Sequence, residues 1–198
     1  MRLYDVIITE DMLIKGVKAL SLVDEPALKN NLFLALENQE EYIQLAEVDK
    51  EKHILMGSVL IPETPIFRKG NPEDFYIRFS KDTIEQAQEY FFKGGMQNFS
   101  TINHSGEQVE GNTVVESWIV EDVEKDKTAL YNLSVPKGSW VVKMKVNNQD
   151  VWDNYVKTGK VKGFSIEGFF KPVEMTELSS EVLTPQEKVD KIRTILNI

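Results

Sequence analysis

The chain has 198 residues, of which 41% are hydrophobic and 28% charged, a balance typical of a folded domain rather than a disordered chain. Its formal net charge is −9, and its lysines and arginines form no cluster, so a nucleic-acid-binding surface is not expected. The absence of cysteine excludes disulfides, thiolate metal sites and cysteine nucleophiles. No apolar run reaches the roughly 20 residues of a membrane span, and acidic residues interrupt the first apolar stretch, unlike a secretory signal. We therefore expect a soluble protein that is made and used inside a cell.

Short apolar runs that end at turn residues predict strands in the first half of the chain. Residues 17–23 are rich in branched side chains, residues 53–61 form a second apolar run, and residues 75–79 alternate aromatic and polar side chains. Residues 30–36 fit either a short helix or a strand. Residues 37–52 are dense in Glu, Gln and Lys, which predicts a surface helix or a loose linker.

A helix is predicted over residues 81–93. Ser80 is a suitable N-cap, and Gly94 marks the C-terminal end. The apolar face repeats at helical spacing and consists of Ile84, Ala87 and Phe91.

Three more strands and two more helices are predicted in the second half. The strands cover residues 113–122, 139–146 and 161–173, the last of them interrupted by glycines. One short helix follows the cap residue Asn148, and a C-terminal amphipathic helix begins at Thr184. The pattern predicts a mixed α+β, β-rich domain over residues 1–175, followed by a linker and helix over residues 176–198.

Two histidines are the candidates for a general base near neutral pH. His53 opens an apolar strand, which favours a strand-edge or core position. His104 ends a half-apolar stretch before a Ser-Gly turn, where a side chain is held firmly yet reaches solvent. An ordinary turn histidine is the alternative. A zinc site with Glu107 and Glu110 would need a helix, which the neighbouring glycines disfavour.

The nucleophile must be a hydroxyl, because the chain has no thiol. Ser165 lies between Gly163 and Gly168, and alternation places it on the face opposite Phe164 and Ile166. The glycines would allow a substrate backbone to approach and leave main-chain N–H groups for an oxyanion. A solvent-facing strand serine is the alternative. The spacing is not that of the G-x-S-x-G nucleophile elbow, so an α/β-hydrolase is disfavoured.

A third residue should orient the histidine, and several carboxylates remain open. Glu116 shares a predicted strand face with apolar neighbours, where a carboxylate would need a partner such as an imidazole N–H. A partly exposed strand glutamate is the alternative. The other candidates are Asp24, Asp122 and Glu167.

Four motifs carry a resemblance to a known family. They are INHSG at residues 102–106, VESWIVED at 115–122, GSWVVKMKV at 138–146 and GFSIEGFF at 163–170. In this order they resemble the phage serine proteases called XkdF-like, over about residues 16–173. That group belongs with the phage prohead proteases, which share a fold with the herpesvirus maturational proteases.

The resemblance implies a β-barrel-like core of about six or seven strands surrounded by helices. It also implies a serine endopeptidase that processes scaffold and major capsid proteins in the assembling procapsid, in the host bacterial cytoplasm, and that cleaves itself. His104 and Ser165 stand where the family has its base and its nucleophile. No cofactor, metal, nucleic acid or membrane is implied, and a homo-oligomer is possible. The stretches 37–52 and 177–183 are candidate self-cleavage sites.

One departure from the family pattern concerns the acid. In ordinary prohead proteases a segment like ALSLVDEPAL follows the nucleophile strand, whereas here it comes first, at residues 19–28, as in a circular permutation. Ala19 occupies the acid's place. The third residue is therefore expected to be Glu116, with Asp24 in reserve, or to be absent. The rival functions are a catalytically inactive scaffold or assembly factor with a protease fold, and a non-proteolytic esterase or amidase.

Overall fold

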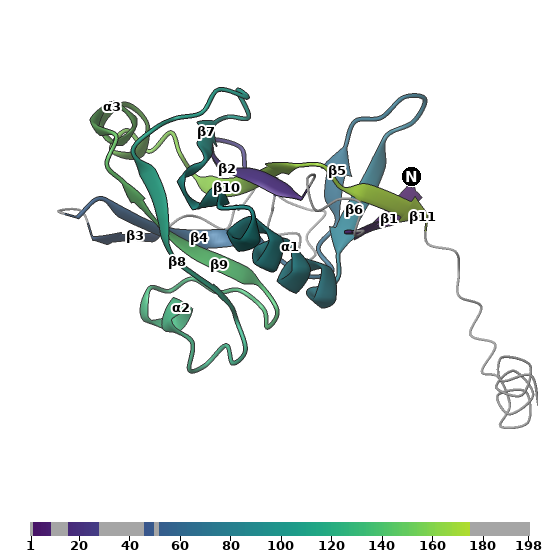
Figure 1. The fold of residues 1–198 in the computed structure, drawn as a ribbon. Helices are drawn as coiled ribbons and strands as arrows, with labels where there is room; N and C mark the ends of the chain where they lie inside the picture. Colours follow the sequence, from purple (N-terminus) through teal and green to yellow (C-terminus); the bar gives the residue numbers. More distant parts are fainter. Residues whose placement is uncertain (1, 9–15, 28–45, 50–51, 175–198) are drawn as a thin grey trace, which may run out of the picture.

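The computed structural model describes residues 2–8, 16–27, 46–49 and 52–174 (Figure 1). The predicted linker and C-terminal helix, the element at 30–36 and most of the stretch 37–52 lie outside these ranges. No helix within them is long and apolar enough to cross a membrane.

The described strands form three sheets. The first sheet contains, in spatial order, β11 (Lys171–Glu174), β1 (Arg2–Ile7), β6 (Phe75–Phe79) and β5 (Ile66–Arg68). The second contains β10 (Gly163–Gly168), β2 (Val17–Val23) and β7 (Ser100–Ile102). The third contains β3 (Ala46–Asp49), β4 (Ile54–Leu60), β9 (Trp140–Val146) and β8 (Asn112–Ile119).

The three-stranded sheet occupies the middle of the molecule, between the two larger sheets (Figure 1). Its β10 packs against β4 of the third sheet, and β10 runs on toward β11 of the first. The sequence prediction of a mixed α+β domain is confirmed. The expected barrel surrounded by helices is not, because the described strands remain in three sheets that do not close.

Helix α1 (Lys81–Lys93) is the longest helix of the described chain and forms as predicted. Ser80 Oγ accepts a hydrogen bond of 3.1 Å from Thr83 N, which satisfies one of the free N–H groups of the first turn. The predicted apolar face packs against β2 and β9. The fully buried ring of Phe91 meets Trp140 edge to face at 5.5 Å. Burial of one such ring contributes about 1.5–3 kcal/mol.

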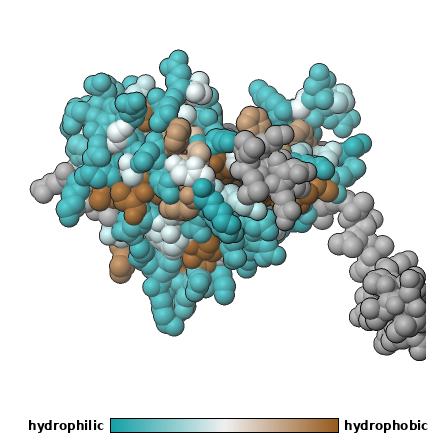
Figure 2. Space-filling model, viewed as in Figure 1, coloured by the Kyte–Doolittle hydropathy of each residue, from teal (hydrophilic) through white to brown (hydrophobic). Residues whose placement is uncertain are grey.

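Strand β9 shows the predicted alternation. Its inward residues Trp140, Val142, Met144 and Val146 are all fully buried, while Lys143 and Lys145 reach the other face. On the face of the molecule that Figure 2 shows, hydrophilic residues predominate and hydrophobic residues form smaller patches between them.

The predicted strand 161–173 is two strands that belong to different sheets. β10 ends with a bulge at Gly168, and β11 begins at Lys171 beside β1. A Cβ at Gly168 would lie 2.4 Å from the carbonyl oxygen of Gly16, so the two chains can approach here only without a side chain. Between the strands, Phe170 packs edge to face on Phe79 at 5.4 Å. This packing turns the chain into the first sheet.

Other elements differ from the prediction in smaller ways. β3 lies within the stretch predicted as a helix or linker. It forms a strand because its backbone pairs in an antiparallel register with β4. β1 was not predicted, and it pairs in parallel with β6. Asn148 caps as expected, accepting from Val151 N at 3.0 Å, but the helix continues in a π-helical turn. The remaining short helices are α2 (Lys127–Leu130), α3 (Gln149–Val151), η2 (Met96–Asn98) and η3 (Trp152–Val156).

Candidate functional site

The middle sheet carries three hydroxyl residues in one row. Ser165 of β10 lies directly opposite Ser21 of β2, and Ser21 lies opposite Thr101 of β7. Directly paired residues project to the same face of a sheet, so the three hydroxyls share one face. All three residues are buried, and we call them the hydroxyl row.

His104 lies in a tight turn that follows β7. Asn103 and His104 both have positive φ, 48° and 56°, and Ser105 N donates to the Ile102 carbonyl at 3.0 Å. This is the geometry of a type I′ turn, in which asparagine is among the favoured residues.

Three hydrogen bonds of 3.0 Å hold this turn to β2 and to the residue that follows it. Asn103 N donates to the Leu22 carbonyl, His104 N donates to Ser21 Oγ, and Asp24 N donates to Asn103 Oδ1. The central hydroxyl of the row therefore fixes the backbone of His104. Non-glycine residues rarely keep positive φ, and these bonds compensate for the backbone strain.

Glu167 is the carboxylate next to His104. Its Oε1 lies 3.5 Å from His104 Nδ1 and also accepts a hydrogen bond from Thr101 Oγ1. Glu167 follows Ser165 by two residues on β10, and its Cα pairs with that of Ala19 on β2. The side chain of Glu167 is 22% exposed and that of His104 is 46% exposed, so the pair stands at the rim of the sheet.

One pocket of about 580 Å³ joins these groups. Ser165, His104 and Glu167 all line it, together with side chains from the first sheet. Its other lining residues are mostly apolar: Val6, Ala27, Arg68, Phe75, Ile77, Phe79, Ile166, Gly168, Phe170 and Pro172. We call it the site pocket.

The Ser165 hydroxyl opens to this pocket. Within the described residues, Asn112 Oδ1 is the one fully buried side-chain polar atom without a partner. Ser165 Oγ makes no hydrogen bond within the described residues and is not among these fully buried atoms. This oxygen is therefore in contact with open space. The other two hydroxyls of the row are bonded, Ser21 to the His104 N–H and Thr101 to Glu167.

The glycines on either side of Ser165 have a structural explanation. A Cβ at Gly163 would lie 2.5 Å from Pro26 Cβ, and one at Gly168 would meet the Gly16 carbonyl. The sequence suggested that these glycines leave room for a substrate. In the structure their missing side chains let segments of the chain itself pack, although Gly168 also lines the pocket.

Glu116 is not paired with the histidine. Its carboxylate accepts from Lys127 and, at 3.0 Å, from Lys143, its partner across the β8–β9 pair. The hydrogen bond from Lys127, followed by that from Lys143, lowers the pKa of Glu116 below its ordinary value. A bulge between Val114 and Glu116 interrupts the alternation on which the prediction rested.

The remaining candidates also have other surroundings. Asp122 pairs with Lys125 at 3.2 Å, and Asp24 contributes its backbone N–H to the His104 turn. His53 stacks on Trp152 with 4.2 Å between ring centres, as a strand-edge histidine would. The described residues contain no group of three or more Asp, Glu or His side chains placed to hold a metal ion.

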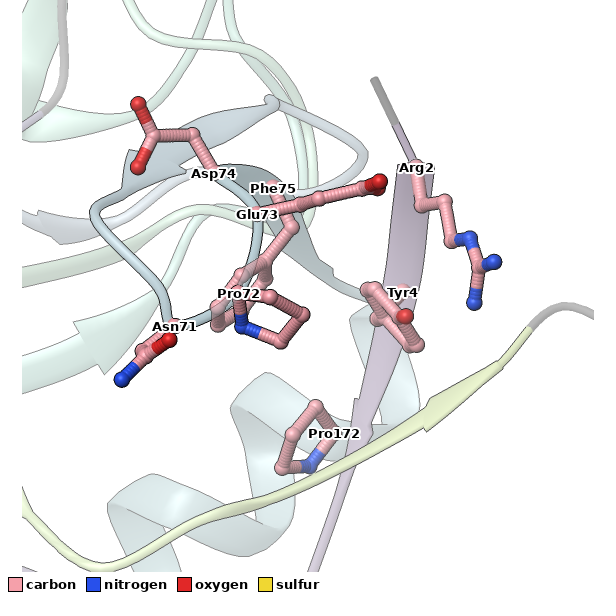
Figure 3. A pocket seen from close by; sticks show the side chains of 8 residues that line it. All are labelled: Arg2, Tyr4, Asn71, Pro72, Glu73, Asp74, Phe75 and Pro172. Atoms are coloured by element: carbon pink, nitrogen blue, oxygen red, sulfur yellow. The ribbon is translucent and has the colours of Figure 1, made fainter.

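A second pocket of about 370 Å³ adjoins the site pocket and shares Phe75 and Pro172 with it. Figure 3 shows Tyr4 between Pro172 and Arg2, with Glu73 extending toward the strand of Arg2. No serine or histidine lines it, so it lacks the serine–histidine pair of the site pocket.

Comparison with known protein families gives a match over most of the described chain. A family model described as "Putative phage serine protease XkdF" matches residues 42–174, more than half of the chain. No curated protein matches the chain, and neither does any solved structure.

Proposed function

The chain belongs to this phage serine protease family, and we propose that it is an endopeptidase in which Ser165 is the nucleophile, His104 the base and Glu167 the orienting carboxylate. The observation that carries the proposal is the contact of 3.5 Å between His104 Nδ1 and Glu167 in the pocket that Ser165 lines. The contact is longer than a direct hydrogen bond, as is common in catalytic groups before substrate binds.

The proposed reaction is acyl transfer to the serine. A carboxylate at Nδ1 holds the proton on that nitrogen, which leaves Nε2 as the acceptor for the Ser165 proton. Ser165 Oγ bonds to the peptide carbonyl carbon while main-chain N–H groups stabilise the oxyanion. His104 then passes the proton to the departing amine, the C–N bond breaks, and an acyl-enzyme forms. Water releases the acyl group by the same route, with His104 as base.

Glu167 fits the gap in the family pattern. The resemblance places the acid at the position of Ala19, and Glu167 is the residue directly across from Ala19. Opposite positions of an antiparallel pair bring their Cβ atoms within about 4.5–5.5 Å, so a carboxylate on either strand can serve one histidine. This replaces Glu116 in the proposed site, since Glu116 is held by two lysines.

The proposed substrates are the major capsid and scaffold proteins of the phage, cut within the assembling procapsid in the host cytoplasm, with self-cleavage. Family membership and the resemblance to prohead proteases support this assignment. An inactive assembly factor is less favoured, because Ser165, His104 and a carboxylate all line one pocket. The herpesvirus-protease-like core that the resemblance implies is also part of this proposal.

Replacement of Ser165 tests the proposal. Ser165→Ala should lower kcat/KM by about 10⁴-fold or more on capsid and scaffold substrates while leaving the fold intact. Ser58→Ala is the matched control, because Ser58 is equally buried on a strand but does not line the pocket. Undiminished cleavage by pure, folded Ser165→Ala protein would overturn the assignment.

Substitution of two glutamates tests whether Glu167 or Glu116 is the orienting carboxylate. Glu167→Gln should lower kcat by about 10²–10⁴-fold, whereas Glu116→Gln should leave it unchanged. The opposite result would restore Glu116. Hydrolysis of small esters without cleavage of proteins would favour the esterase alternative.

Self-cleavage has its own measurement. Mass spectrometry of the purified protein should show discrete products cut within residues 37–52 or 177–183. These products should be absent from Ser165→Ala protein. Their presence in that variant would assign them to another protease.

A further inference from the structure

Arg68 brings a positive charge into the apolar site pocket. It ends β5, where its Cα pairs with that of Phe75, as Ile66 pairs with Ile77. Alternation places Arg68 on the same face as Ile66, while Phe67 points outward and is exposed. Arg68, Phe75 and Ile77 all line the pocket, so β5 and β6 contribute to its wall together with β10.

The guanidinium of Arg68 has unused donors. It donates to the carbonyl of Phe67 at 3.0 Å, and the structure gives it no other hydrogen bond or ion pair within the described ranges. A guanidinium has five N–H donors. Several of them therefore remain for a molecule in the pocket.

The other two arginines of the described chain are paired with carboxylates. Arg78 binds Asp5 at 2.7 Å and Glu63 at 3.0 Å, and Arg2 lies 3.4 Å from Glu174. Burial lowers the pKa of Arg68 below its ordinary value, and no described carboxylate opposes that effect. Arg68 is thus the arginine whose charge the described residues leave uncompensated.

The acidic residue that lines the pocket is already engaged. Glu167 is the one carboxylate among the lining residues, and it is held by Thr101 and His104. Arg68 is partly buried, and a partly desolvated charge without a partner is costly, so a ligand carboxylate would offset that cost. The surrounding wall of Phe, Ile and Val side chains would strengthen the interaction by excluding water.

We propose that Arg68 is the specificity residue of the site pocket and that it binds the side-chain carboxylate of an Asp or Glu near the scissile bond of the substrate. This inference rests on the proposed peptidase function, because the same pocket contains Ser165. An acidic side chain can form two parallel hydrogen bonds with the guanidinium fork.

The test uses peptides of one neutral sequence with both termini blocked, in which a single Glu is moved through successive positions. Blocked termini ensure that the carboxylate comes from a side chain. At one position, Glu should raise kcat/KM by about 10- to 100-fold over Gln, the range expected for a charge-assisted hydrogen bond. Lys at that position should be cleaved least.

The variants locate the preference. Arg68→Gln should remove the advantage of Glu over Gln, and Arg68→Lys should retain part of it, because the charge remains without the fork. Arg78→Gln is the matched control and should leave the preference intact, since Arg78 does not line the pocket. Melting curves check that each variant folds. A preference for Glu that survives Arg68→Gln would overturn the proposal.

Binding to Ser165→Ala protein, measured by fluorescence anisotropy, separates the two proposals. If the wild type cleaves peptides through Ser165 but treats Glu, Gln and Lys alike, the Arg68 proposal fails and the peptidase stands. If no peptide is cleaved yet Glu peptides bind in an Arg68-dependent way, the peptidase fails and the carboxylate site stands. Equal binding of Glu and Gln peptides would refute the carboxylate site in either case.

Discussion

Thr101 offers a test of the proposed site that does not touch the substrate. Its hydroxyl donates to Glu167 Oε1, the same oxygen that faces His104 Nδ1. Thr101 is 4% exposed and does not line the site pocket. Thr101→Val keeps the shape of the side chain and removes this donor. Thr101→Ser keeps the donor and removes a methyl group.

The expected effect follows from the loss of one hydrogen bond to a charged group, worth about 1.5–3 kcal/mol. If that bond fixes Glu167 beside His104, its loss should lower kcat by about 10- to 100-fold. KM should stay nearly constant, because Thr101 has no place in the substrate pocket. Thr101→Ser should retain most of the wild-type kcat.

Steady-state kinetics on one peptide or capsid substrate gives kcat and KM for the three proteins, and thermal melting gives their stability. A positioning role predicts a change in kcat that Ser rescues. A purely structural role predicts a lower Tm with unchanged kcat per folded molecule. If Thr101→Val folds and turns over at the wild-type rate, or if Ser fails to rescue it, the role given to Thr101 is wrong.

Three more predictions concern the frame of the site. Gly168→Ala should destabilise the protein by about 1–3 kcal/mol, seen as a lower Tm, because the new methyl group meets the rigid carbonyl of Gly16; an unchanged Tm would contradict the close packing. Asn103→Ala should reduce activity more than Asn103→Gly, because glycine accepts the φ of 48° that alanine disfavours; equal kcat values would count against the turn. Glu116→Gln should lower Tm by a few degrees at neutral pH, an effect kept small by exposure to solvent. The pKa of Glu116 is lowered in the folded state, so its ion pairs stabilise the fold above about pH 4.5, and the difference in Tm from wild type should vanish as the pH falls through the folded-state value.

The parts of the fold that follow from local patterns could be predicted. The Ser80 cap, the spacing of Ile84, Ala87 and Phe91, and the alternation in β9 each depend on neighbouring residues, and each is confirmed. Whether three sheets close into a barrel depends instead on which strands pair. The sequence of residues 161–173 by itself does not show that Gly168 packs against the Gly16 carbonyl. It also does not show that the chain passes into another sheet after this glycine.

The candidate site could likewise be predicted only in part from the sequence. The strand alternation of β10 and the Ser-Gly turn after His104 were visible in the sequence, and Ser165 and His104 line one pocket. The sequence offers Glu167 only as one of several candidate carboxylates. Its position beside His104 depends on the strand register that pairs it with Ala19 and on the hydrogen bond from Thr101 of β7. The sequence also does not show the β8 bulge before Glu116 or the two lysines that hold its carboxylate.

The hydroxyl row supports the choice of Ser165 as the proposed nucleophile of the middle sheet. Three hydroxyls lie side by side, and hydrogen bonding gives each a different task. Ser21 accepts a hydrogen bond from the His104 N–H, and Thr101 donates one to Glu167. Both hydroxyls therefore position the groups that would act on Ser165. Ser165 alone of the three lines the pocket, which leaves its oxygen able to meet a carbonyl carbon. The order of segments along the chain does not enter this arrangement. β2 pairs with β10 through the same register whichever of the two strands comes first along the chain, so the proposed site does not depend on their order.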